Sequence, residues 1–393
     1  MPILQDLRHT HDEAGVINLA LEILTLLRDP LAMEMSIDAF SEILATNRHI
    51  ETGEAKRIQH GVRQAIFAMI GFLTMLYVPV TTFINGKFTI VVPNGLDTIR
   101  TQQSCDKAQN RLSGFLKGFG KLLPFSAKST PAGSEDEPDE ELFVSKLSYF
   151  SLRHLSQLNI VWTNDLSSHL YFNEDTHDLM LFRLPSFCLS HIEDQHNSSF
   201  FQRFVAQIYL IYLLCSDIFY SAIELLCAQL DNAQSSETSL CRMYVHEILL
   251  TYRIIFGQEK GSRSLFKAVE KRKATENGIK DPFLSRLCCH ASIDSKGPLD
   301  SQFVSSDVYR KNEDFPIFGE RLLNLQCHIS RQNPSKLFAL WRDRRNPLNF
   351  FNLWAVIIFG ILTIVLGVLQ LVVGIISLVV AYKQLAQGQG TGM

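Results

Sequence analysis

The chain has 393 residues, of which 46% are hydrophobic, and a formal net charge of −3 at pH 7. Outside an apolar C-terminal segment the length is enough for about two domains with buried cores, and the charge balance argues against a nucleic-acid-binding protein, which would carry a basic excess. The first residues carry charges where a signal peptide would place its apolar region, so no secretory leader is expected.

The cysteines follow no disulfide-framework spacing, and several lie in apolar runs such as Leu213-Leu214-Cys215. Reduced and mostly buried thiols in a cytosolic body are therefore expected. One sequon, Asn197-Ser198-Ser199, would accept a glycan only if this region were lumenal.

Residues 1–125 are predicted to form a helical N-terminal domain. Thr10–Glu13 has the form of a capping box, and apolar residues then recur at helical spacing until Asp29-Pro30 ends the helix. Further helices are predicted over residues 36–45 and 54–78. A short strand over 88–92 is predicted to close with a turn at Pro93-Asn94-Gly95.

The segment Ala65–Ile84 is uncharged and long enough to be a second membrane span. A span here would place residues 85–345 outside the cytosol and reverse the final helix. A buried or membrane-skimming helix avoids this conflict and is preferred, while the span stays an alternative.

The segment Leu112–Leu123 has one apolar face opposite four cations, Lys107, Arg111, Lys117 and Lys121. Such a basic amphipathic helix either lies on an anionic membrane surface or is half-buried in the protein. Residues 126–141 then change to Ser, Thr, Pro and Gly followed by an acidic run, which predicts a disordered linker and a domain boundary.

Residues 142–345 are predicted to form an α+β domain that is mostly helical. Short apolar runs at 158–162, 170–172 and 179–182, separated by polar turns, predict a small antiparallel meander. The later periodicity predicts helices over residues 199–231, 238–256, 262–276, 318–331 and 337–345.

Residues 350–382 contain no charged side chain, which predicts a transmembrane helix, because about 20 apolar residues cross the hydrocarbon core. Arg342, Arg344 and Arg345 precede this helix, and they can bind anionic lipid. Because only Lys383 follows it, the positive-inside rule predicts a cytosolic N-terminal body and a short extracytosolic tail over residues 383–393. The long, very apolar helix and nearly uncharged tail favour the secretory system or plasma membrane.

Small and polar residues in this helix recur at an alternating spacing of three and four, the a and d positions of a heptad. The seam consists of Gly360, Thr363, Gly367, Gln370, Gly374, Ser377 and Ala381. In lipid, helices associate where small residues let backbones approach and polar side chains bond across. The seam therefore predicts self-association through the transmembrane helix.

No catalytic, cofactor-binding or metal-binding residues are predicted. Phosphate-loop, nucleophile-elbow, zinc-protease, dinucleotide-binding and kinase motifs do not occur. Cys288-Cys289-His290 and Cys327-His328 supply soft ligands, but adjacent cysteines point apart rather than converge on zinc. Asp165 and His169 lie within a polar stretch that a turn explains without catalysis.

Three segments carry a resemblance. They are Val161–Leu170 with Phe182–Cys188, Asp314–Leu322, and Leu340-Trp-Arg-Asp-Arg-Arg-Asn-Pro347 leading to Trp354. Together they resemble uncharacterised filamentous-fungal proteins that end in one membrane helix. The final helix is more weakly similar to plant membrane-anchored proteins of unknown function. The resemblance implies a fungal accessory protein and brings no catalytic set.

The predicted fold is mainly α with a small antiparallel β meander and a C-terminal transmembrane helix. The predicted function is a tail-anchored, non-enzymatic, cytosolic-facing adaptor or regulator that its membrane helix clusters and that has an unknown cytosolic protein partner. A fungal setting would link it to cell surface, morphology or a biosynthetic gene cluster. The alternatives are a membrane-tethered enzyme with an unrecognised site and a two-span transport component.

Overall fold

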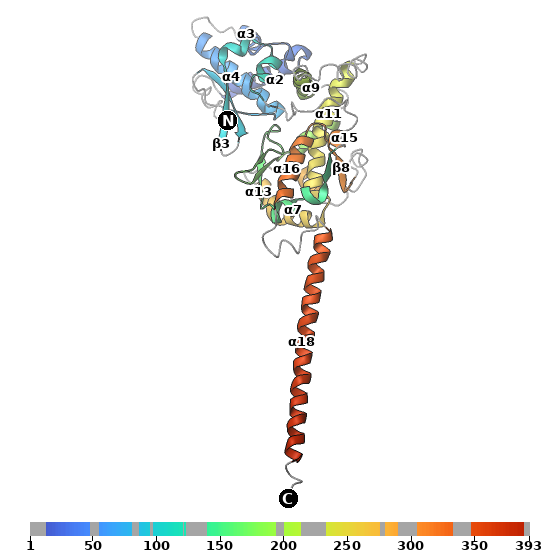
Figure 1. Ribbon diagram of the computed structural model, residues 1–393. Coiled ribbons are helices and arrows are strands. Elements are labelled where there is room, and N and C mark those ends of the chain that lie inside the picture. Colours follow the sequence, from blue (N-terminus) through green and yellow to red (C-terminus); the bar gives the residue numbers. More distant parts are fainter. Residues whose placement is uncertain are drawn as a thin grey trace. The chain divides into compact units, whose positions relative to one another are not determined.

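The computed structural model describes residues 13–47, 55–80, 86–94, 97–120, 122, 140–193, 200–213, 233–275, 280–289, 305–332 and 347–388 (Figure 1). The chain divides into two compact units, Met1–Gln332 and Asn333–Met393. The first unit is mostly helical and contains small sheets, and the described part of the second is one long helix. The predicted mainly α class is confirmed at this level.

The N-terminal part of the first unit combines helices with an antiparallel sheet. Its elements are α2 (Glu13–Arg28), η1 (Pro30–Met33), α3 (Ile37–Asn47), α4 (Ala55–Thr74), β1 (Val78–Pro79), β2 (Lys87–Asn94), β3 (Asp97–Ser104), η2 (Cys105–Gln109) and α5 (Leu112–Lys117). The strand order is β1-β2-β3, with both pairs antiparallel. Strand β2 extends through Asn94, so Pro93 and Asn94, which were predicted to lie in a turn, belong to the strand, and Gly95 lies outside the described residues.

The first helix ends where the sequence predicts. Helix α2 stops at Arg28, and the Asp29 carboxylate accepts a hydrogen bond from the Leu31 N–H at 2.8 Å as Pro30 opens η1. An aspartate cap followed by proline at the first helical position is a favoured helix start. Of the predicted capping box, only Glu13 is among the described residues.

The segment Ala65–Ile84 does not form one helix. Helix α4 ends at Thr74, Met75 has a φ of 49°, and the chain then enters β1. Phe67 is fully buried and its ring lies 5.0 Å from that of Tyr77 and 5.1 Å from that of Phe88. The structure therefore places most of residues 65–80 in the protein core, which favours the buried helix over the second span; residues 81–84 lie outside the described residues.

The predicted basic amphipathic helix is shorter than expected. Helix α5 covers only Leu112–Lys117, and its apolar residues Leu112, Phe115 and Leu116 are buried against the rest of the unit. The rings of Phe115 and Phe88 meet edge to face at 5.1 Å. Because the apolar face packs on protein, the half-buried alternative holds rather than the membrane-surface one.

The remainder of the first unit is a helical assembly with two small sheets. Its elements are β4 (Glu141–Phe143), α6 (Val144–Leu147), α7 (Tyr149–His154), β5 (Asn159–Thr163), β6 (Phe172–Asn173), β7 (Asp178–Phe182), α8 (Pro185–Glu193), α9 (Phe200–Leu213), α11 (Ala233–Tyr252), η4 (Arg253–Gly257), α12 (Lys260–Leu265), η5 (Phe266–Glu270), α13 (Lys271–Ala274), α14 (Pro282–Cys289), β8 (Val308–Arg310), α15 (Lys311–Asp314) and α16 (Gly319–Arg331). Strands β4 and β8 form an antiparallel pair between segments far apart in the chain.

The predicted meander is wrong at one pairing. Strands β6 and β7 are antiparallel, but β5 pairs with β7 in parallel, which gives the order β5-β7-β6. The reason is the connection after β5. Residues 164–171 form a compact turn region in which Leu170 has a φ of 59°, so the chain reverses before β6 and returns in β7 beside β5.

Two helices of this assembly contain π-helical segments. Helix α11 continues into η4, and α12 continues into η5, both of which are π-helices. The segment η5 falls within the predicted helix 262–276, and η4 overlaps the end of the predicted helix 238–256 and extends one residue past it; the α-helical periodicity of both gave no sign of the wider turns. Residues Arg253–Gly257 are all buried, so η4 lies in the interior.

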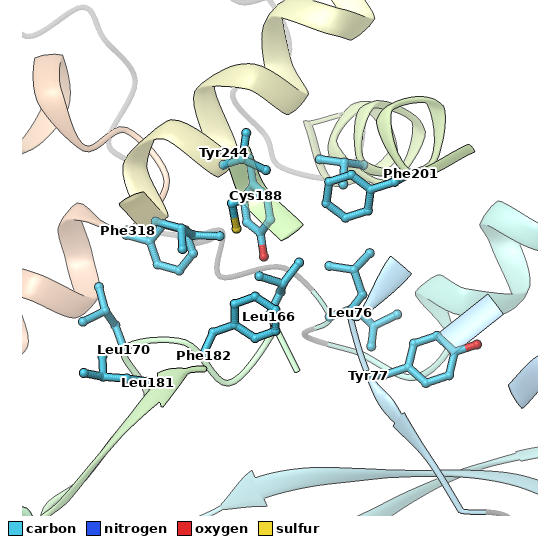
Figure 2. Packing of buried hydrophobic residues seen from close by; sticks show 14 of the residues in the cluster. Leu76, Tyr77, Leu166, Leu170, Leu181, Phe182, Cys188, Phe201, Tyr244 and Phe318 are labelled. Carbon is cyan, nitrogen blue, oxygen red and sulfur yellow. The ribbon is translucent and has the colours of Figure 1, made fainter. Parts of the chain in front are cut away.

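One continuous core joins the N-terminal elements to the later ones. Figure 2 shows Leu76, from the N-terminal elements, near Leu166 and Phe201, from the later ones. The backbone N–H of Leu166 also donates to the Met75 carbonyl at 2.6 Å. The two predicted domains thus contribute to one compact unit; the linker expected at 126–141 lies almost wholly outside the described residues and stays a prediction.

The second unit contains helix α18 (Pro347–Gly388), which has 42 residues. Within it, Trp354–Lys383 is long and apolar enough to cross a membrane, and it is the one such helix among the described residues. The predicted span of 350–382 falls inside α18. The helix predicted over 337–345 lies outside the described residues.

Candidate functional site

The predicted seam lies on one continuous helix whose side chains are exposed. All seven seam residues fall within the 30-residue apolar stretch of α18, and none of that stretch is buried inside the protein. The large apolar side chains beside the seam are equally uncovered, with Phe359 67% and Ile364 68% exposed. Among the described residues nothing covers this stretch, and a helix that is apolar all round is suited to a membrane-spanning position.

The glycines of the seam leave space beside the backbone. A Cβ atom added at Gly360, Gly367 or Gly374 would meet nothing within 4 Å. On the same face, the Thr363 hydroxyl donates to the Phe359 carbonyl at 2.7 Å, so its hydrogen is satisfied within the helix. The exposed Gln370 amide lies one heptad further along. The face can therefore accept a close neighbour and offers it one strong polar group.

The charged ends of the span are only partly described. Arg342, Arg344 and Arg345, predicted to orient the helix and to bind anionic lipid, lie outside the described residues. Lys383 lies in α18 at the end of the apolar stretch.

A buried histidine forms the first of two polar centres in the first unit. His169 is fully buried; its Nδ1 accepts the Phe182 N–H at 3.2 Å, and its Nε2 lies 2.8 Å from the Thr251 hydroxyl oxygen. Because Nδ1 is an acceptor, the proton is assigned to Nε2. Burial, assisted by the charge of Arg321, lowers the pKa of His169 to about 3. The imidazole is therefore neutral and acts as a connector in the core.

Arg321 and Glu247 tie this centre to α16. The Arg321 guanidinium donates to the Ser167 carbonyl at 2.9 Å and to the His169 carbonyl. The Glu247 carboxyl accepts the Phe318 N–H at 2.8 Å and the Ile317 N–H at 3.1 Å, next to the start of α16. Burial raises the pKa of Glu247 to about 8, while these backbone bonds act in the opposite direction. Both side chains satisfy backbone groups.

The second polar centre is the carboxylate of Glu270, which is fully buried at the end of η5. The Tyr149 hydroxyl donates to its Oε1 at 2.6 Å, and the Trp162 indole N–H donates to its Oε2 at 3.2 Å. Lys273 lies 3.3 Å from Oε1. Burial and this carboxylate raise the pKa of Tyr149. This buried carboxylate, with its three donors, links β5, α7 and α13 to η5.

Sequence reasoning found neither centre. It noted Asp165 and His169 as an acid and a base in one polar stretch, but the structure separates their roles. The Asp165 carboxylate accepts from the hydroxyls of Thr163, Ser167 and Ser168, so it organises the turn, while His169 contacts β7 and α11. The partners that define these centres, Tyr149 and Trp162 for Glu270 and Ile317 and Phe318 for Glu247, are distant in sequence, so no local pattern marked either acid.

The soft-ligand residues do not converge in the described part of the chain. Cys288 is buried, Cys289 is half-buried and Cys327 is exposed. No group of three or more His, Cys, Asp or Glu residues is placed to hold a metal there, and His290 lies outside it.

Comparison of the chain with protein-family models, with curated proteins and with solved structures finds no match in any of the three. The resemblances to fungal and plant proteins therefore stay predictions.

Proposed function

We propose that this chain is a tail-anchored single-pass membrane protein that acts as an adaptor or regulator and is clustered by α18. The observation that carries the proposal is the exposed apolar stretch Trp354–Lys383 with small and polar residues along one face. The first unit contains the buried core, and α18 anchors the chain in the membrane. A role in fungal cell surface or morphology rests on the resemblance alone.

Self-association follows from how helices interact in lipid. Apolar side chains gain nothing by leaving lipid for another apolar surface, so packing and interhelical hydrogen bonds drive association. Glycine at three successive a positions, Gly360, Gly367 and Gly374, allows two backbones to approach closely. Gln370 would gain a partner for an amide that lipid cannot satisfy. A second copy of the same helix presents the matching face.

The arginines before the span, Arg342, Arg344 and Arg345, support a cytosolic location of the first unit. Three arginines precede the span and one lysine follows it, which under the positive-inside rule keeps the N-terminal side in the cytosol. The 30-residue stretch is about 45 Å long as an α-helix. It exceeds a hydrocarbon core of about 30 Å and suits thicker membranes of the secretory system or plasma membrane.

The hydrogen bonds of the buried titratable groups favour an adaptor role over a catalytic one. Glu270, Glu247 and His169 each bond to core donors or acceptors, which accounts for them as structural residues. Clustering through α18 would raise the local concentration of the first unit, so that weak contacts with a cytosolic protein become effective.

The seam is tested by replacing Gly360, Gly367 and Gly374 with isoleucine in the isolated membrane segment. Branched side chains at these positions would hold the backbones apart. We expect the dimer signal in a membrane two-hybrid reporter to fall by at least about tenfold, since the close packing is lost.

The matched control replaces Val365, Val372 and Val379 with isoleucine. These residues occupy the f positions, on the far side of the helix from the seam, and are 48%, 45% and 48% exposed. Their replacement should leave the signal unchanged. An undiminished signal in the glycine variant, or an equal loss in the valine variant, argues against the seam.

A further inference from the structure

A surface depression of about 570 Å³ lies between η5, α13 and α14 in the first unit. Its walls are formed by Lys267, Lys271, Pro282, Ser285, Arg286 and Cys289. Lys267 and Lys271 are four residues apart on one helical run, and Ser285 and Cys289 are four residues apart on α14. Each helix thus turns one row of side chains toward the same space.

The depression is strongly positive in a chain that is negative overall. Its three charged wall residues are all cations, and all three are exposed. The helical run Lys260–Ala274 carries six cations and one acid, Glu270, against a net charge of −3 for the whole chain. The ion pairs found in the described part of the chain do not include Lys267, Lys271 or Arg286.

Two acids that are close in sequence and lie among the described residues are engaged elsewhere. Glu270 is fully buried and bound by Tyr149, Trp162 and Lys273. Asp281 is buried and accepts the Ser186 N–H at 2.8 Å, the Ser186 hydroxyl and the Phe283 N–H at 2.8 Å. These contacts hold both carboxylates with partners other than Lys267, Lys271 and Arg286. The positive charges of Lys267, Lys271 and Arg286 therefore repel one another, and a bound anion would relieve this repulsion.

The uncharged wall residues add donors rather than a nucleophile. Burial raises the pKa of the Cys289 thiol, although Lys267 and Lys271 act to lower it. The thiol is therefore protonated at neutral pH, when only a thiolate would attack a substrate. It contributes a weak S–H donor beside the hydroxyl of Ser285.

We propose that this depression binds a multiply phosphorylated anion, either a phosphoinositide headgroup or a free polyphosphorylated compound. Phosphate groups concentrate several negative charges in a small volume, and lysine point charges with an arginine fork suit them. The volume lies in the range of about 300–1,000 Å³ that small-ligand sites occupy. The site gives the first unit a ligand that does not depend on self-association of α18.

The test uses the full chain in phosphatidylcholine nanodiscs titrated with inositol trisphosphate by isothermal titration calorimetry. The variant Lys267→Gln, Lys271→Gln, Arg286→Gln should bind at least about tenfold more weakly, because three charge-assisted contacts are lost. The control is Lys260→Gln, Arg272→Gln, Lys280→Gln, which removes the same charge from exposed positions that do not line the depression. It should lose no more than about threefold, the effect of general attraction.

A second arm separates the two sources of phosphate. Hydrogen exchange over residues 260–289 is compared between plain nanodiscs and nanodiscs containing phosphatidylinositol bisphosphate. Protection by the lipid that the pocket variant abolishes assigns the headgroup, and protection only by soluble inositol trisphosphate assigns the free compound. Absence of binding in both arms, or equal losses of affinity in the pocket and control variants, overturns the proposal. Circular dichroism spectra that match the wild type establish that both variants are folded.

Discussion

At the scale of single residues, the core is specified by polar groups as well as by apolar ones. His169, Glu247 and Glu270 are buried and hydrogen-bonded to partners from other elements. Burying such groups costs free energy unless they are paired, so each one selects a single arrangement of its neighbours. Tyr244 differs, because its buried hydroxyl has no partner among the described residues and lies among apolar side chains in Figure 2.

His169 predicts how stability depends on pH. The pKa of this residue is lowered from 6.5 to about 3 by burial, so the unfolded chain binds a proton that the folded chain excludes. The stability that the neutral His169 side chain contributes is fully present above the pKa of histidine in the unfolded chain, and it is lost as the pH falls below that pKa. We expect His169 alone to lower the free energy of unfolding by about 2 kcal/mol between about pH 6.5 and pH 5.

This contribution is measured by urea unfolding of the full chain in detergent, followed by tryptophan fluorescence. The variant His169→Asn should be less stable at neutral pH and should lack this part of the acid dependence. His60→Asn, at an exposed position, is the matched control for the substitution itself. If His169→Asn keeps the same slope as the wild type, the imidazole is not held neutral in the core.

At the scale of elements, the π-segment η4 brings two helices into unusually close contact. A Cβ atom added at Gly257 would lie 2.8 Å from the Leu287 carbonyl oxygen and 2.8 Å from Arg253 Nη1. The Arg253 guanidinium also donates to the Leu287 carbonyl at 3.4 Å. Glycine at this position therefore lets α14 approach the backbone of η4.

Replacing this glycine with alanine should separate the two elements. We expect Gly257→Ala to lower the free energy of unfolding by about 1–3 kcal/mol, because a backbone oxygen must shift. The control Gly114→Ala lies in α5, where an added Cβ meets nothing within 4 Å; it should raise stability by about 0.5–1 kcal/mol. Equal effects of the two substitutions in thermal or urea unfolding would show that the contact at Gly257 is not tight.

The sequence predicted the elements whose information is local. The apolar period identified α2, α16 and α18, and Asp29-Pro30 marked a helix end with its own side chain. Features that depend on distant partners were missed. Strand β3 has a polar sequence with no strand pattern of its own, and it forms by pairing with β2. The parallel pairing of β5 with β7 depends on the turn region that follows β5.

The seam on α18 was visible in the sequence for the same reason. Its seven residues are set by helical spacing alone, which a regular helix preserves. The polar centres and the basic depression were not visible, because they assemble side chains from elements such as η5 and α14 that the sequence does not place together. Periodicity reports faces of helices and does not report which faces meet.

At the scale of the whole molecule, the chain consists of a first unit with one core and a second unit with an uncovered apolar helix. The two units have different requirements. The first buries its apolar residues internally, whereas the apolar side chains of α18 are exposed, as the proposed contacts with lipid and with another helix require. The proposed function depends on α18 being a membrane helix that pairs along its seam.

Cysteine-scanning crosslinking of the full chain in membranes tests this most directly, because α18 contains no cysteine of its own. Single cysteines are placed from Gly360 to Ala381, and disulfide-linked dimers are compared with the parent chain. We expect dimers at the seam positions Gly360, Gly367 and Gly374 and little at Val365, Val372 and Val379. Equal crosslinking on all faces, no crosslinking above the parent, or release of the chain from membranes by carbonate would be evidence against the proposed function.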